Sequence, residues 1–316
     1  MTLPVVAVTG ATGFIGRRIV RALVDYGCDV RALARRASAL EQEMPTDAVS
    51  WVIGSLTDDV ALEALVKDTI AVVHCAGAIK AHNREAFLAI NGAGTRRIAE
   101  IAAAQPVPPR FILLSSLAAR EPRLSAYAAS KRAGEQAVRG LQGKLPAIIL
   151  RPPAVYGPGD METLKVFQMA ARGFMATPMV AGARASLVHV DDVAGAVLAA
   201  LELDTLPDQP IEFDDGTPGA YSWADIAAAA GAALRTNPRL IPVPAPVLYI
   251  AGALASISAA LTRRPGVMSW DKVPELLHPD WVAADGLFPG YKPLWDIQKG
   301  FKDTVTWYTS RGLLTS

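Results

Sequence analysis

A tyrosine and a lysine four residues apart could transfer a proton. Tyr127 and Lys131 lie in the segment YAASK, within residues 125–141, whose apolar spacing predicts a helix. A four-residue offset on a helix places both side chains on one face. Free tyrosine has a pKa near ~10, and a neighbouring ammonium favours the phenolate and lowers that pKa toward neutrality. The pair therefore has the chemistry of a general acid and base.

Two serines end the apolar run that precedes this helix. Ser115 and Ser116 follow the residues FILL, which are typical of a buried strand. A serine hydroxyl near Tyr127 could hold the oxygen atom to which the tyrosine passes a proton. Because Tyr-x-x-x-Lys is common by chance in helices, its meaning depends on the elements that position it.

The first of these elements is a glycine-rich loop. The segment VTGATGFIG places Gly10, Gly13 and Gly16 after a valine-rich strand and before apolar residues at helical spacing. A second apolar strand follows at residues 28–34, so the order is strand, loop, helix, strand within about thirty residues. The free N–H groups and the dipole of a helix N-terminus favour an anion. We expect this loop to bind the pyrophosphate of a dinucleotide and not to be only a tight turn.

The end of the second strand bears on the choice of dinucleotide. NAD sites usually place a carboxylate there, whereas NADP sites place arginine near the 2′-phosphate. Here the strand ends at Arg35 and Arg36 with no carboxylate. Guanidinium groups suit phosphate, although these two could also be solvated surface charges. The sequence predicts NADP(H).

The alternation of strands and helices continues along the chain. It predicts an α/β fold with a Rossmann-type doubly wound parallel sheet, whose ligand site lies at the carboxyl ends of the strands. The expected strands cover 50–56, 69–78, 110–116 and 146–153, and the expected helices cover 84–105 and 125–141.

The pattern resembles the extended short-chain dehydrogenases/reductases, also called the NAD-dependent epimerase/dehydratase family. The matching segments are TGATGFIG, HCAGA, NGAGT, LLSS, YAASK, LRPPAVYGPGD and LVHVDDVAGA, which together span most of the chain. By this resemblance Tyr127 is the catalytic acid and base, and Lys131 binds the nicotinamide ribose and tunes the tyrosine. Ser116 matches the position that polarises the substrate, with Ser115 as the alternative. Asn91 matches a helix asparagine that supports a proton relay, or it bends the helix through a backbone hydrogen bond.

The glycine loop and the resemblance together predict the cofactor contacts. The expected cofactor-binding residues are Gly10, Thr12, Gly13, Phe14, Ile15, Gly16, Arg35, Arg36, Ser55, Leu56, Ala76, Gly77, Tyr127, Lys131, Pro152, Pro153 and Val155.

Two features depart from the family pattern. Ser55 stands where members usually carry an aspartate that holds the adenine, and Asp58 could take its place. The interval between Ser116 and Tyr127 is short for an enzyme with a nucleotide-sugar pocket, which disfavours that substrate.

The second half of the chain predicts a smaller lobe. Residues 1–156 and about 185–203 are assigned to the dinucleotide-binding domain, and about 157–184 and 204–316 to a substrate-binding lobe. His189 precedes Asp191 and Asp192, but a strand histidine is more often structural, and no third ligand is nearby. No metal is expected.

The composition limits the class of partner and the compartment. The 316 residues are 51% hydrophobic, with 31 Lys and Arg against 30 Asp and Glu, which disfavours nucleic acid as a partner. Cys28 and Cys75 predict buried reduced thiols, and no leader sequence is visible, so we expect a cytoplasmic protein. The family resemblance implies a homodimer.

One long segment carries no charge. Residues 240–262 read LIPVPAPVLYIAGALASISAALT, and the prolines in its front leave a helix of about fifteen residues, short for a transmembrane span. This segment, followed by Arg263 and Arg264, could lie peripherally on the inner face of a membrane, or it could be a buried helix of the lobe.

Three functions fit these features. We favour an NADP(H)-dependent reductase of a hydrophobic lipid ketone, with a 3-oxo-sphingoid or 3-oxo-ceramide the first choice of substrate and a 3β-hydroxysterol next. A nucleotide-sugar epimerase or dehydratase is the alternative enzyme. A non-catalytic dinucleotide-binding subunit is the third, and retention of both Tyr127 and Lys131 weighs against it.

Overall fold

A seven-stranded parallel sheet forms the centre of the molecule. The computed structural model describes residues 3–36, 47–262, 266, 269–284 and 286–314. The sheet has the order β11-β6-β5-β4-β1-β2-β3, with every neighbouring pair parallel. Its strands are β1 (Val5–Thr9), β2 (Asp29–Ala34), β3 (Val49–Ile53), β4 (Ala71–His74), β5 (Arg110–Leu114), β6 (Ala147–Arg151) and β11 (Ile211–Glu212).

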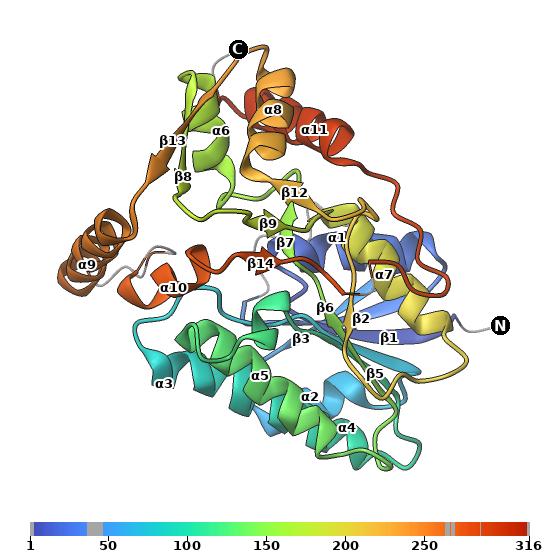
Figure 1. Ribbon diagram of the computed structural model, residues 1–316. Helices are drawn as coiled ribbons and strands as arrows, with labels where there is room; N and C mark the ends of the chain where they lie inside the picture. Colours follow the sequence, from blue (N-terminus) through green and yellow to red (C-terminus); the bar gives the residue numbers. More distant parts are fainter. Residues whose placement is uncertain (1–2, 37–46, 263–265, 267–268, 285, 315–316) are drawn as a thin grey trace.

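Helices cover both faces of this sheet (Figure 1). One face packs against α1 and α7, and the other against α2, α4 and α5, so apolar clusters fill both sides. Strands buried on both faces read as continuous apolar runs, which is why the sequence predicted all seven except β11. The predicted Rossmann-type doubly wound fold is confirmed. The helical segments are α1 (Phe14–Asp25), α2 (Asp59–Val66), α3 (Arg84–Phe87), a π-helical turn (Leu88–Gly94), α4 (Thr95–Ala103), a 3₁₀ turn (Leu117–Arg120), α5 (Ala126–Arg139) and α7 (Val190–Glu202).

A smaller lobe lies across the carboxyl ends of the strands (Figure 1). Its own core is aromatic: Tyr156, Phe167, Phe301 and Tyr308 are buried in contact with one another. The lobe comprises α6 (Leu164–Ala171), β8 (Phe174–Pro178), β9 (Arg184–Ala185), β12 (Tyr221–Ser222), α8 (Trp223–Leu234), β13 (Arg239–Val243), α9 (Ala245–Thr262), a 3₁₀ turn (Trp270–Lys272), α10 (Val273–Leu276), β14 (Asp280–Trp281) and α11 (Ile297–Ser310).

The strand pairing where the two parts meet differs from the expected one. Residues 185–203 were expected to rejoin the sheet, but β10 (Leu187–His189) pairs with β7 (Ala154–Tyr156) in a separate two-stranded sheet. Only α7 returns, to pack against α1. Conversely, β11 lies within the range assigned to the lobe, yet it extends the central sheet beside β6. A two-residue strand is too short to produce a recognisable alternation of residues.

The uncharged segment forms β13 and α9. The helix begins at Ala245, before the expected start, because a proline in the first turn removes only an N–H that has no partner within the helix. Among the described residues, no helix is long and apolar enough to cross a membrane.

Candidate active site

The glycine loop joins β1 to α1 in a tight turn. Gly10 has φ +71°, and a Cβ there would come within 2.6 Å of the Ala76 amide nitrogen. A Cβ at Gly16 would come within 2.0 Å of the Gly10 carbonyl oxygen, so only glycine allows this approach. The Gly13 amide donates to the Gly10 carbonyl at 2.9 Å, and α1 begins at the next residue, Phe14. The loop therefore has the backbone shape that a pyrophosphate at a helix N-terminus requires.

The residues expected around the adenine ribose lie at the ends of β2 and β3. Arg35 and Arg36 are exposed directly after β2. Ser55 bonds to Thr57 at 2.8 Å, and the Asp58 carboxylate accepts from the Ala61 amide at 3.1 Å as the N-cap of α2. Asp58 thus already has a structural partner, which argues against its holding the adenine.

The remaining expected cofactor residues line the same edge of the sheet. Ala76 and Gly77 follow β4, and the Ala76 amide donates to the Thr9 hydroxyl at 3.3 Å. Leu56 packs closely against Gly94 of the π-helical turn. A Cβ at Gly94 would come within 2.9 Å of the Leu56 side chain. Thr12 is exposed and Ile15 half-buried at the glycine loop, while Pro152, Pro153 and Val155 follow β6.

Ser116, Tyr127 and Lys131 meet above β5. The Tyr127 and Ser116 hydroxyls share a hydrogen bond, and the Lys131 ammonium donates to the Leu114 carbonyl at 2.8 Å. Ser115 points elsewhere and donates to Glu135 at 2.6 Å. Of the two serines, Ser116 is the one placed beside the tyrosine.

Burial sets the protonation of this cluster. It raises the pKa of Tyr127 to about 12; the hydrogen bond with Ser116 opposes this effect and the Glu275 carboxylate adds to it. It lowers the pKa of Lys131 to about 8, against the attraction of Glu135. The expected lowering of the Tyr127 pKa toward neutrality is therefore wrong, because burial outweighs it. Near neutral pH, Tyr127 is a proton donor, and Lys131 is a cation close to its titration point.

Asn91 holds the loop after β4 in place. It is buried in the π-helical turn, where its Oδ1 accepts from the Ala78 amide at 2.7 Å and its Nδ2 donates to Ser130 at 2.8 Å. Ser130 in turn donates to the Tyr127 carbonyl at 2.7 Å. A Cβ at Gly77 would lie 3.1 Å from Asn91 Oδ1 and 3.7 Å from Lys131 Nζ, so both groups face this loop. The amide thus fixes the loop, and a relay role for Asn91 stays a prediction.

A segment from the lobe covers Tyr127, and we call residues 270–276 the cap segment. The Lys272 ammonium lies 4.4 Å from the centroid of the Tyr127 ring and pairs with Glu275. Glu275 also accepts from Ser125, the N-cap residue of α5, and Asp271 accepts from the Ala126 amide at 2.7 Å. Sequence reasoning missed these residues because they lie some 145 positions from their partners and match no local motif.

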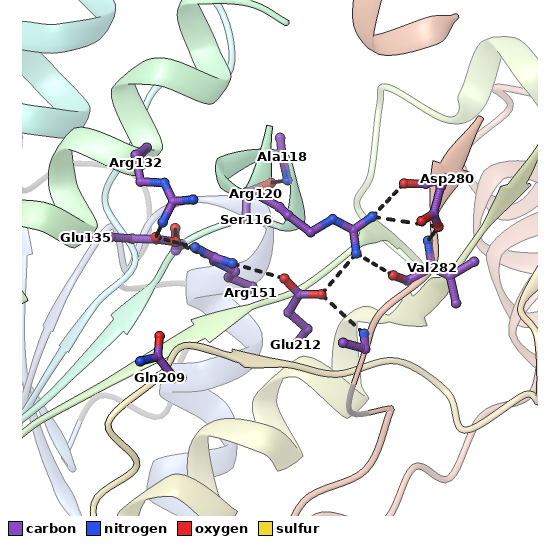
Figure 2. A network of polar contacts seen from close by, with 12 residues as sticks. Ser116, Ala118, Arg120, Arg132, Glu135, Arg151, Gln209, Glu212, Asp280 and Val282 are labelled. Carbon is purple, nitrogen blue, oxygen red and sulfur yellow. Dashed lines mark hydrogen bonds and ion pairs between the residues drawn. The ribbon is translucent and has the colours of Figure 1, made fainter. Parts of the chain in front are cut away.

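A buried ionic network that includes Glu135, the acceptor of the Ser115 hydroxyl, lies next to the cluster (Figure 2). Arg151 donates to Glu135 through Nη2 at 2.7 Å and Nε at 2.8 Å, and to Glu212 at 3.0 Å. Arg120 joins Glu212 at 3.2 Å and reaches the lobe through the Val282 carbonyl at 2.7 Å. The network links α5, β6 and β11 to the lobe at Val282, which directly follows β14. It was also missed, since buried charges on separate elements leave no sequence signal.

His189 has the structural role expected of it. It is buried, caps α7 by accepting from the Asp191 amide, and stacks on Trp295 at 4.2 Å, and burial lowers its pKa to about 3. Asp191 faces Arg18 at 3.5 Å, while Asp192 accepts from two backbone amides. Within the described residues, no group of three or more His, Cys, Asp or Glu could hold a metal ion.

The comparisons with known proteins agree with this geometry. A model of the NAD dependent epimerase/dehydratase family matches residues 6–212. The chain belongs to this family. It is 42% identical to a ceramide reductase from Caulobacter vibrioides (strain NA1000 / CB15N), over 98% of this chain and 96% of that protein. It is 26% identical to a UDP-glucose 4-epimerase from Vibrio cholerae, over 95% of this chain and 94% of the epimerase.

Solved structures agree on the fold. The crystal structure of gox2253 superposes with a TM-score of 0.76 at 21% identity, covering 99% of each chain. Other structures with this fold are complexes with NAD. The chain is therefore a member of a dinucleotide-dependent enzyme family whose members act on small molecules, and its relatives include a reductase and an epimerase.

Proposed function

We propose that this family member reduces a long-chain lipid ketone to its alcohol with NADP(H), a 3-oxo-ceramide or 3-oxo-sphingoid being the best candidate. The observation that carries the proposal is the 42% identity to a ceramide reductase along nearly the whole of both chains. The uncharged surface of the lobe, described below, supports a substrate of low solubility.

The reaction uses the cluster above β5. When bound, the nicotinamide supplies the hydride to the carbonyl carbon in reduction and accepts it in oxidation. Tyr127 donates its hydroxyl proton to the carbonyl oxygen, and Ser116 donates a hydrogen bond to that oxygen. Lys131 lies one helical turn from Tyr127, where its charge favours the phenolate that remains. One ketone, one reduced cofactor and one proton thus give one alcohol and one oxidised cofactor.

NADP(H) as the cofactor is part of the proposal. Gly10 and Gly16 allow the close backbone approaches of a tight strand-to-helix turn, because a Cβ at either position would collide with the backbone, and such a turn suits a pyrophosphate at the helix N-terminus. Arg35 and Arg36 are exposed beside the expected position of the 2′-phosphate, with no carboxylate at that strand end to repel it.

A nucleotide-sugar epimerase remains the second candidate because of the full-length similarity to a UDP-glucose 4-epimerase. The interval from Ser116 to Tyr127 is occupied by one short 3₁₀ turn, which leaves few residues to bind a sugar nucleotide. NADPH oxidation with a detergent-dispersed 3-oxo-ceramide tests the proposal. We expect turnover with this lipid and none with UDP-glucose; turnover of UDP-glucose alone, with cofactor retained, would select the epimerase.

A further inference from the structure

Helix α9 is attached to the lobe by its small residues. Gly252 is buried, and a Cβ there would lie 3.0 Å from the Ser269 carbonyl and 2.9 Å from Val273. One turn later, the Ser256 hydroxyl accepts from the Trp270 amide at 3.0 Å and donates within the helix to the Gly252 carbonyl. The helix therefore contacts the cap segment through side chains that contribute little apolar area.

The large side chains of α9 point outward. Five of them recur at alternating intervals of three and four residues, which places them along one side of a helix. We call them the α9 stripe: Val247, Ile250, Leu254, Ile257 and Leu261, with exposed fractions of 51%, 62%, 63%, 57% and 81%. A helix that turns small residues inward and large apolar residues outward needs an apolar environment on its outer side.

The flanks of the stripe are basic. From residue 226 to residue 270 the sequence has no acidic residue, and its only charges are four arginines: Arg235 precedes β13, Arg239 is the first residue of β13, and the other two follow α9. Arg235 and Arg239 are exposed. Arg263 and Arg264 lie outside the described residues, so only their positions in the sequence are known. Basic flanks around an uncharged centre complement an anionic surface that has an apolar interior.

Aromatic and aliphatic side chains extend the apolar surface beyond the stripe. Trp270 is 54% exposed in the cap segment and lies 4.7 Å from the ring of Tyr249. Leu240 and Ile241 are exposed on β13, and Figure 1 shows α9 and β13 together at one margin of the lobe. Amphipathic aromatic rings of this kind favour the boundary between headgroups and acyl chains.

We propose that the α9 stripe docks on an anionic phospholipid bilayer, with the helix lying along the surface. A second protein chain is the weaker fit, because protein interfaces carry about one hydrogen bond per 100–200 Å² and a polar rim. The stripe offers apolar side chains alone, and the hydroxyls of Ser256 and Thr262 already donate to carbonyls of their own helix. The docking itself does not depend on the reaction. Its benefit to catalysis rests on the proposed function: a lipid ketone leaving the bilayer beside the cap segment would reach Tyr127 without crossing water.

Co-sedimentation of the full-length protein with vesicles tests the docking without any substrate. Phosphatidylcholine vesicles with and without phosphatidylglycerol would be compared, using the wild type and the stripe variant Ile250→Ser, Leu254→Ser, Ile257→Ser. The matched control replaces exposed apolar residues distant in sequence from α9 (Val60→Ser, Ile70→Ser, Val107→Ser), which are 77%, 55% and 82% exposed. NADPH binding and the thermal midpoint would show that each variant is folded.

We expect the wild type and the control to bind vesicles containing phosphatidylglycerol, more weakly at high salt, and the stripe variant to bind about tenfold or more weakly. Equal binding by the stripe variant, or no binding by the wild type, would overturn the proposal. So would a dimer in sedimentation velocity that only the stripe variant loses, since the stripe would then bind a second copy. If the protein binds vesicles but does not reduce lipid ketones, the docking proposal stands and the proposed function is refuted.

Discussion

Single residues acquire their chemistry here from burial. Tyr127 is held neutral by its surroundings, with a pKa near 12, while Lys131 has a pKa near 8. The resemblance of the YAASK and LLSS segments to known enzymes suggested both roles and favoured Ser116 over Ser115, but the sequence did not reveal what holds Ser115 away from the tyrosine. That choice depends on Glu135, which takes the hydroxyl of Ser115.

Tyr127→Phe should reduce kcat by about 10²–10⁴-fold, because only the proton-donating hydroxyl is lost. Cofactor binding, followed by NADPH fluorescence, should be unchanged. Ser115→Ala serves as the comparison, since its hydroxyl is bound away from the site. Wild-type turnover by the phenylalanine variant would show that another group delivers the proton.

The pH dependence follows from the same two groups. Lys131 carries its charge below its pKa of about 8 and loses it above, whereas Tyr127 keeps its proton throughout this range. We therefore expect kcat/KM for reduction to be level at neutral pH and to fall as the pH rises through about 8. A profile for Lys131→Met with the same fall would assign the titration to a different group.

The two exposed arginines after β2 should determine the preference for NADPH. Wild-type kcat/KM should favour NADPH over NADH by about tenfold or more, and Arg35→Ala with Arg36→Ala should remove that preference. Arg96→Ala, an exposed arginine of α4, is the control. Equal use of both cofactors by the wild type would refute the assignment.

At the scale of elements, the sequence predicted those helices and strands that follow from local residue patterns, but not those that depend on long-range contacts. The glycine loop, α1 and β2 follow each other directly, so their apolar spacing and glycines sufficed to predict them. The π-helical turn interrupts what reads as one helix over 84–105, because its extra residue lets Asn91 reach the loop after β4. β11 and the cap segment depend on partners far along the chain, and no local spacing indicates such partners.

The cap segment should tune Tyr127. Since the Lys272 ammonium lies over the tyrosine ring, Lys272→Met removes a nearby cation and leaves Glu275 without this ionic partner. Both changes disfavour the phenolate, so the rate of alcohol oxidation at a fixed pH below the pKa of Tyr127 should fall by about threefold to tenfold. Lys272→Arg should retain the wild-type rate; an unchanged rate in Lys272→Met would mean that Lys272 only packs there.

At the scale of the whole molecule, the two parts are joined by the network in Figure 2. Arg151 is 8% exposed and binds Glu135 and Glu212 together, so its removal takes the shortest ion pair from each of these two buried carboxylates. Arg151→Met should lower the free energy of unfolding by about 3–5 kcal/mol in urea titrations. Arg139→Met, at the exposed end of α5, should cost about 1 kcal/mol or less. Equal losses for both variants would show that the network adds nothing specific.

The reduction of a lipid ketone at Tyr127 can be followed atom by atom. NADPH deuterated at the transferring position of the nicotinamide would be incubated with detergent-dispersed 3-oxo-ceramide, and the lipid product analysed by mass spectrometry. We predict one deuterium in the product alcohol for each NADP⁺ released, and about 10²-fold less of both, or a greater loss, with Tyr127→Phe over the same time. Absence of label from the lipid, with UDP-glucose epimerised by an enzyme that releases no cofactor, would contradict the proposed function.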